Sequence, residues 1–119
     1  MGTLMIGRRG GRERDERHLQ FVRSLCCVSC GDNTSVEAAH LRAGARGFGK
    51  PPTGKGKKPD DKWVLPLCSK CHRIQHSMNE LKFWEERGIE PFIAARGLYD
   101  CGGDITMVDE IFERAREYA

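Results

Sequence analysis

No long apolar run occurs anywhere in the 119-residue sequence. A transmembrane helix needs about 20 mostly apolar residues, so we expect no membrane-spanning segment and no membrane partner. A secretory leader needs an apolar segment of roughly 7–15 residues near its start, and residues 1–10 instead include the pair Arg8-Arg9. Because we expect neither a membrane-spanning segment nor a secretory leader, we expect a cytoplasmic protein. The sequence also contains no internal repeat.

A Walker phosphate-binding pattern is missing as well. Residues 54–57, Gly-Lys-Gly-Lys, resemble it only in part, so nucleotide hydrolysis is not expected. Apolar residues are limited to 39% of the chain, against 31% charged residues. This length allows one domain with a modest core. Metal binding would add folding free energy that so small a core needs.

The sequence does contain six cysteines, and four of them form two C-x-x-C pairs. Cys27 pairs in this way with Cys30, and Cys68 with Cys71, with 37 residues between the pairs. Two such pairs are typical of a closed, tetrahedral, structural zinc site. A secreted disulfide framework is the alternative, but without a leader the spacing fits a metal site in a reducing compartment better.

Two cysteines remain outside these pairs. Cys26 competes with Cys27 for the first ligand position, but only Cys27 has the common two-residue spacing to Cys30. We therefore predict that Cys26 is buried and is not a metal ligand. Cys101 stands alone and is expected to be a free thiol.

Three histidines accompany the cysteines. His72 follows Cys71 directly, and His76 comes four residues later, so the two share one face of any helix that begins near Cys71. This spacing suits a second metal held by imidazole nitrogens. His40 ends an expected strand. The alternative is that His40 only caps the strand and that His72 only forms a hydrogen bond with a carbonyl of the C-x-x-C turn.

Apolar spacing and turn residues predict two short strands and several helices. Residues 36–41 and 63–67 are the expected strands, which form a hairpin with a very long connection, and Pro66 favours an edge position. The expected helices are residues 12–25, 69–77, 80–87, 91–98 and 105–118. The expected organisation is a flexible basic arm (1–11), a zinc domain (12–100) and a C-terminal amphipathic helix packed on the same domain (101–119).

The last expected helix carries one apolar stripe, which predicts core packing or a dimer seam. Residues 77–119 hold ten acidic and five basic side chains, so this end of the chain is acidic. The residues of the stripe are Ile105, Val108, Ile111, Phe112 and Ala115.

A basic, glycine-rich loop joins the two strands. Residues 42–62 contain seven Lys or Arg and only two Asp, and this composition cannot form a packed core. A basic centre beside an acidic tail favours a surface for polyanions, although a solvated lysine-rich loop is the alternative. Contacts to phosphate would give affinity that depends on salt and not on sequence. The candidate contact residues are Arg42, Arg46, Lys50, Lys55, Lys57 and Lys58.

Taken in order, these features resemble the HNH endonucleases, whose ββα-metal core is often built on a treble-clef zinc site. The similarity covers roughly residues 26–100, through C-x-x-C, a strand ending in histidine, and C-x-x-C-H-x-x-x-H. Four shorter segments resemble a bacteriophage and prophage group within this family, and the Ref recombination nuclease is a broader relative. The four segments are residues 39–42, 58–61, 66–68 and 83–84.

The resemblance implies a role for each histidine. His40 matches the general base that activates water, a task that suits neutral imidazole, while His72 and His76 match metal-binding histidines. Two positions depart from the family: Ala39 stands where a His or Asp ligand is common, and Trp63 stands where an Asn holds the loop. The residues that could fill in for the ligand are Glu37, Asp60 and Asp61, and either aspartate could replace the Asn.

The resemblance implies an α+β fold, with a small treble-clef ββα-metal core, a structural zinc site of four cysteines and flanking helices. It implies metal-dependent hydrolysis of DNA phosphodiester bonds, in phage recombination, replication or packaging, in the cytoplasm of a bacterial host cell. The implied cofactors are structural Zn²⁺ and catalytic Mg²⁺, Mn²⁺ or another divalent cation. The implied partners are DNA and either a second copy, as a homodimer, or other phage proteins.

Two other functions stay open. A non-catalytic, zinc-dependent DNA-binding module is favoured by Ala39 and Trp63, because both departures weaken a catalytic site. A protein-interaction adaptor that uses the acidic C-terminal helix would need neither the basic loop nor the paired histidines.

Overall fold

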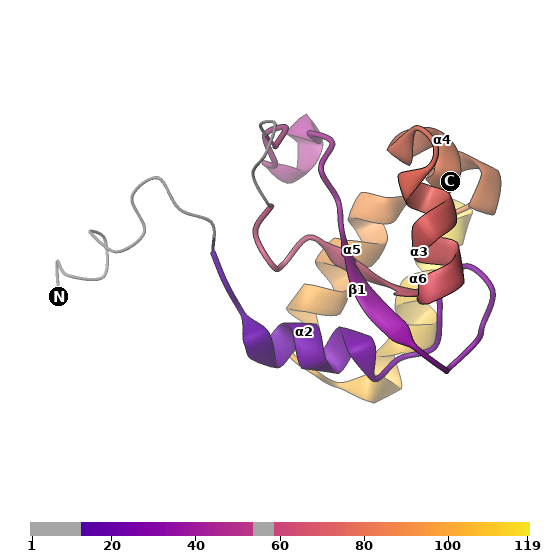
Figure 1. Ribbon diagram of the computed structural model, residues 1–119. Helices are drawn as coiled ribbons and strands as arrows, with labels where there is room; N and C mark the ends of the chain where they lie inside the picture. The colour runs from indigo at the N-terminus through magenta and orange to yellow at the C-terminus, as the bar shows by residue number, and fades with distance from the viewer. Residues whose placement is uncertain (1–12, 54–58) are drawn as a thin grey trace, which may run out of the picture.

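A two-stranded antiparallel sheet lies at the centre of the computed structural model, which describes residues 13–53 and 59–119. Helices surround it, which confirms the expected α+β class: Figure 1 shows α2 below β1, α3 beside it, and α5 and α6 behind. The arm expected at residues 1–11 lies outside the described residues. The elements in chain order are α2 (Glu16–Arg23), β1 (Val36–His40), the 3-10 turn η1 (Arg46–Phe48), β2 (Val64–Cys68), α3 (Ser69–His76), α4 (Glu80–Arg87), α5 (Pro91–Asp100), the 3-10 turn η2 (Ile105–Met107) and α6 (Val108–Glu117).

The two strands pair in a register that sets the later chemistry. Glu37 lies opposite Leu67, and His40 lies opposite Val64. All residues of β2 are buried. Pro66 fits this strand because its carbonyl accepts a hydrogen bond from the Val28 N–H, 3.0 Å away, on the side away from β1. Its nitrogen, which has no hydrogen, points to that same side, so no β1 hydrogen bond is lost.

Capping residues define most of the helices. The Asn79 side chain accepts the Lys82 N–H at the start of α4, and Gly88 ends that helix with φ 69°. Glu90 caps α5 immediately before Pro91. The first helix begins later than expected, at Glu16, because the Asp15 side chain accepts the His18 N–H.

The C-terminal stripe is divided between core and surface. Val108, Phe112 and Ala115 are buried, whereas Ile105 is 63% exposed. Ile105 lies beside Val108 and Phe112 but is not in the core or in α6, because Asp104 caps a 3-10 turn and α6 begins only at Val108. Ile111 is only partly buried against the core.

One cysteine also differs from expectation. Cys26 is exposed and not buried as predicted, whereas Cys27 is 2% exposed. The reason is local: the turn that follows points Cys27 inward, and its carbonyl accepts the Gly31 N–H at 2.8 Å. None of the helices in residues 13–53 and 59–119 is long and apolar enough to cross a membrane.

Candidate functional site

Four cysteine sulfurs meet where the two C-x-x-C turns face each other. The Sγ atoms of Cys27, Cys30, Cys68 and Cys71 all lie within 4.8 Å of one another. The Cys30 and Cys68 sulfurs are 3.7 Å apart. Four sulfurs bound at about 2.3 Å around one tetrahedral zinc lie about 3.8 Å from each other. The cluster therefore has the donor set and the spacing for a metal ion such as zinc.

Backbone amides already point at these sulfurs. The Cys30 N–H donates to Cys27 Sγ at 3.5 Å, and the Cys71 N–H donates to Cys68 Sγ at 3.5 Å. Each C-x-x-C turn therefore offers its first sulfur a hydrogen bond from the amide of its second cysteine. The second turn is also the start of α3, because Cys68 is the N-cap of that helix. The cluster thus fixes where α3 begins.

Burial makes an ionised cluster unfavourable without a cation. Burial raises the pKa of the Cys71 thiol to about 12. Burial also acts to raise the pKa of Cys27, but hydrogen bonds from backbone groups outweigh it and lower that pKa. A cation would compensate four close thiolates, which is the usual condition for metal binding by cysteine.

The helix that follows presents its histidines outward. Cys71 and Gln75 face the core, and His72 and His76, each one residue further along, share the outer face of α3. Their Nε2 atoms are 3.1 Å apart. Two nitrogens bound at about 2.1 Å to one cation lie about 3.0–3.4 Å apart, so the pair could grip a divalent ion.

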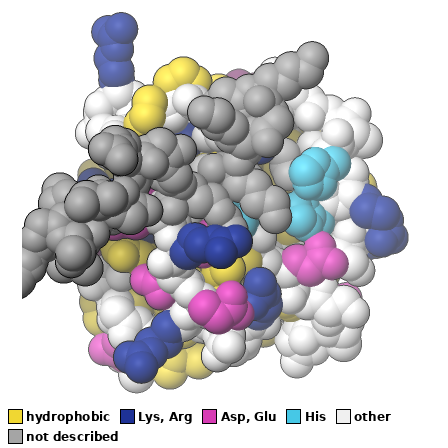
Figure 2. Space-filling model, turned by 60° about the vertical axis from the view of Figure 1, so that its left-hand side comes forward, with side chains coloured by type: hydrophobic (Ala, Val, Ile, Leu, Met, Phe, Trp, Pro, Cys, Tyr) yellow, Lys and Arg dark blue, Asp and Glu magenta, His cyan; other side chains and the backbone are white. Residues whose placement is uncertain are grey.

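A carboxylate of β1 holds the first of these histidines. The Nδ1 atom of His72 lies 2.6 Å from Oε1 of Glu37. A carboxylate accepts hydrogen bonds, so Nδ1 carries the proton and the Nε2 lone pair faces His76. Glu37 therefore orients His72. In Figure 2, histidine side chains gather beside an acidic side chain, with basic side chains on either side.

The third expected histidine is paired with an aspartate. His40 Nε2 lies 2.9 Å from Oδ1 of Asp61, which is 2% exposed. The other carboxylate oxygen of Asp61 accepts the Asp15 N–H at 2.8 Å. Since β1 side chains alternate, Glu37 and Ala39 lie on one face and His40 on the other. The two histidine groups therefore lie on opposite faces of the same strand.

The neighbouring aspartate has a different contact. Asp60 Oδ1 accepts the Glu13 N–H at 2.7 Å, whereas the His40 ring bonds Asp61. Together Asp60 and Asp61 hold the segment that leads into α2. From the sequence alone, Asp60 and Asp61 are equal candidates to support the site. In the structure Asp61 contacts a histidine of the site, whereas Asp60 anchors the chain before α2.

The two departures from the HNH pattern are both packed into the core. Ala39 is 2% exposed, so a larger side chain there would displace its neighbours instead of simply adding a ligand. Trp63 is 4% exposed, its ring lies 6.2 Å from that of Phe92, and its carbonyl accepts the Leu41 N–H. Both residues are structural in this chain.

The basic loop is only partly the surface that the sequence predicts. Arg42 and Arg46 are exposed. The prediction that Lys50 contacts phosphate does not fit its burial: it is 4% exposed, and its Nζ donates to the Pro51 carbonyl at 3.2 Å. Burial also lowers the pKa of Lys50. Lys55, Lys57 and Lys58 lie outside the described residues.

Sequence reasoning missed the residue that anchors this loop. The Glu80 carboxylate accepts the Arg42 N–H at 3.0 Å and the Ala43 N–H at 2.9 Å, which ties the start of the loop to α4. Glu80 reads in the sequence only as the first residue of a helix. A contact across 38 positions leaves no local signal, so no sequence pattern could have found it.

Comparison with known proteins gives one match. A family model described as "Protein of unknown function (DUF968)" matches residues 5–101. Neither a curated protein nor a solved structure matches the chain.

The cysteine cluster makes a direct prediction about bound metal. Protein purified without chelator should contain about one tightly held zinc, and Cys68→Ser should lose it and unfold at a lower temperature, because metal binding contributes folding free energy. Elemental analysis and thermal unfolding measure the two effects. Cys26→Ser and Cys101→Ser are matched controls, since neither residue belongs to the cluster. A disulfide at Cys68, or equal zinc loss in the controls, contradicts the assignment.

Proposed function

The chain belongs to the family described as a protein of unknown function (DUF968), and from its own site we propose that it is a metal-dependent DNA endonuclease of the HNH type. The observation that carries the proposal is the layout around β1: His40 held by Asp61 at 2.9 Å, and His72 held by Glu37 at 2.6 Å. One cysteine turn before β1 and a second between β2 and α3 are consistent with a treble-clef ββα-metal core.

Asp61 gives His40 the tautomer that a general base needs. A carboxylate accepts hydrogen bonds, so the proton of neutral His40 lies on Nε2. Nδ1 is then the nitrogen with a lone pair, which can take a proton from water as it attacks phosphorus. The Asp15 N–H fixes the other oxygen of Asp61, so the carboxylate keeps its orientation during the reaction. The His40 side chain is 21% exposed.

The α3 histidines supply the second half of the reaction. His72 and His76 would hold a divalent cation, which would neutralise charge on the scissile phosphate and on the departing 3′ oxygen. Glu37 contributes by fixing His72, as carboxylates commonly do behind metal-binding imidazoles. Imidazole nitrogen suits Ni²⁺ or Zn²⁺, whereas Mg²⁺ and Mn²⁺ prefer oxygen ligands. We therefore place Ni²⁺ or another late transition metal ahead of Mg²⁺.

We place the phosphodiester along the edge of β1 that faces away from β2. In the described residues β1 pairs only with β2, so no further strand is paired along its other edge. His40 follows Glu37 by three positions, about 10 Å along the strand. His40 and the α3 histidines lie on opposite faces of β1, so the proposed substrate passes over this edge and contacts both. The exposed Arg42 and Arg46 follow directly after His40 and suit the flanking phosphates.

Two features favour the non-catalytic alternative, a zinc-dependent DNA-binding module. Ala39 offers no ligand atom, and the described residues form only one group of three or more potential ligands, the cysteines. The protein-interaction adaptor has less support. It would not need histidines that are each held by a carboxylate, as His40 and His72 are. Cleavage assays decide between the first two functions.

The base assignment predicts a specific pattern of lost activity. His40→Ala and Asp61→Asn should each reduce plasmid nicking by about 10²–10⁴-fold, because the first removes the base and the second no longer enforces its tautomer. The zinc content and the circular dichroism of His40→Ala should stay unchanged. Asp60→Asn is the matched control, since Asp60 anchors the same segment through the Glu13 amide. Wild-type nicking rates in His40→Ala would rule out this mechanism.

The metal assignment predicts separable binding losses. His72→Ala and His76→Ala should each weaken binding of Mn²⁺ to the zinc-loaded protein, and Glu37→Gln should weaken it by about 10–100-fold as an orienting residue. Titration calorimetry or Mn²⁺ paramagnetic resonance measures binding without any cleavage. Glu85→Gln removes an exposed carboxylate of α4 and serves as the control. Unchanged Mn²⁺ affinity in all three variants would favour the binding-only function.

The loop assignment predicts weaker and less salt-dependent DNA binding. Arg42→Glu and Arg46→Glu should lower affinity for all sequences alike, and each lost phosphate contact should flatten the slope of log affinity against log salt by about 0.9. Fluorescence anisotropy across a salt series measures both quantities. Lys82→Glu, an exposed charge reversal on α4, is the control. If the arginine variants and the control behave alike, the loop is only a solvated connection.

A further inference from the structure

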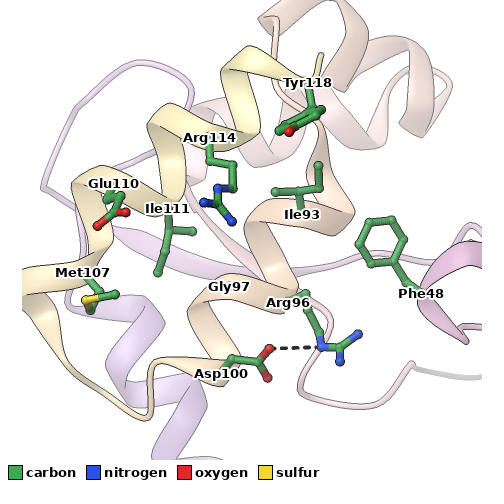
Figure 3. Close-up of a pocket in the computed structure, with 10 residues that line it drawn as sticks. All are labelled: Phe48, Ile93, Arg96, Gly97, Asp100, Met107, Glu110, Ile111, Arg114 and Tyr118. Carbon is green, nitrogen blue, oxygen red and sulfur yellow. Dashed lines mark hydrogen bonds and ion pairs between the residues drawn. The ribbon is translucent and has the colours of Figure 1, made fainter.

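A shallow groove runs between α5 and α6, and neither the cysteine cluster nor the histidines use it. Its volume is about 550 Å³. Figure 3 shows the two helices side by side, with Phe48 reaching in from η1 at one side. The floor is apolar. The lining residues used below are Ile93, Gly97, Ile111, Met107, Tyr118 and Phe48.

A glycine brings the helices close enough to form the floor. A Cβ at Gly97 would lie 2.7 Å from Cγ2 of Ile111, which is closer than side chains pack. Ile111 therefore lies against the backbone of α5. Ile93 continues the floor one turn earlier on α5, and both isoleucines are only partly buried. The described residues leave this apolar strip without a covering element.

The rim of the groove adds exposed apolar side chains. Met107 is 41% exposed and Tyr118 is 66% exposed. They stand at opposite ends of α6, so the apolar strip runs the length of the helix (Figure 3). Contiguous exposed apolar surface of this kind commonly marks a protein contact. A single exposed apolar residue would not indicate a protein contact. Here Met107 and Tyr118 lie in one groove with Ile93 and Ile111.

The charges around the groove balance. Arg96 and Arg114 stand on its rim with Asp100 and Glu110. Arg96 bonds Asp100 at 3.2 Å within α5. In residues 13–53 and 59–119, Glu110 and Arg114 form no ion pair, although they lie four residues apart on α6. One positive and one negative charge are thus left beside the same apolar strip.

We propose that a second copy of this chain docks in the α5–α6 groove through a two-fold axis. In such an interface the same patch meets itself, and with the axis passing between Glu110 and Arg114, Glu110 of one copy faces Arg114 of the other, twice. The balanced rim supports this occupant over a nucleic acid, which requires an excess of positive charge. Tyr118 and Met107 then cover the isoleucines of the opposite floor.

The placement of the groove leaves the candidate site open. Figure 1 shows α5 and α6 behind β1, while α3 lies beside that strand. No α3 residue lines the groove, so a dimer through it would leave His72 and His76 of both copies outside the contact, with Phe48 of η1 at its edge. The inference does not depend on catalysis, because it rests only on the groove residues.

The first test is the mass of the protein in solution. Sedimentation equilibrium across a dilution series should give twice the 13.4 kDa of the chain at high concentration. Met107→Asp and Tyr118→Asp should each weaken association by more than about tenfold, because a charge would be buried in an apolar contact. Both residues are exposed, so the variants should keep wild-type zinc content and circular dichroism. A wild type that stays monomeric, or a dimer unaffected by both variants, overturns the proposal.

A charge-exchange experiment tests the two-fold pairing. Glu110→Arg and Arg114→Glu should each be monomeric alone, because like charges then face each other twice. Mixed together they should form a heterodimer, since both pairs become attractive again. The matched control mixes Lys82→Glu with Glu85→Arg, which carry the same charge changes on exposed positions of α4. These control variants should each dimerise like the wild type. Failure of the first mixture to associate overturns the pairing through this groove.

Discussion

Four sulfur atoms within 4.8 Å are the constraint on which the rest of this structure depends. They join a turn before β1 to the turn that ends β2 and begins α3, so three elements of the site meet at one point. The Cys68 side chain is also the N-cap of α3. A small apolar core could not fix these elements so closely by itself, because 31% of the residues are charged. A metal ion would therefore act as part of the core.

The geometry of the histidines follows from that junction. With α3 starting at Ser69, Cys71 and Gln75 turn inward and the two residues that follow them turn outward. The pairing of β1 with β2 then brings Glu37 to the first turn of α3, where it meets His72. Moving the register by one residue would turn Glu37 to the other face. The orientation of one imidazole thus depends on strand register and on the cysteine cluster together.

Local features of this site were predictable, and contacts between distant segments were not. The cysteine cluster, the helix caps at Asn79 and Gly88 and the outward pair on α3 all follow from spacings of a few residues. The contact of Asp61 with His40 and the burial of Lys50 depend on how a long loop folds back. Ile105 shows the same limit on a smaller scale, because periodicity alone cannot distinguish a 3-10 turn from the first turn of a helix.

Asp61 couples the site to the first helix in a way that neither element shows alone. One oxygen of its carboxylate bonds His40, and the other bonds the amide of Asp15, whose side chain caps α2. A carboxylate with two partners on opposite oxygens cannot rotate toward one without losing the other. Any shift of α2 relative to β1 therefore changes the contact that sets the His40 tautomer. The packing of α2 on both strands, seen below β1 in Figure 1, accordingly belongs to the chemistry of the site as well as to its stability.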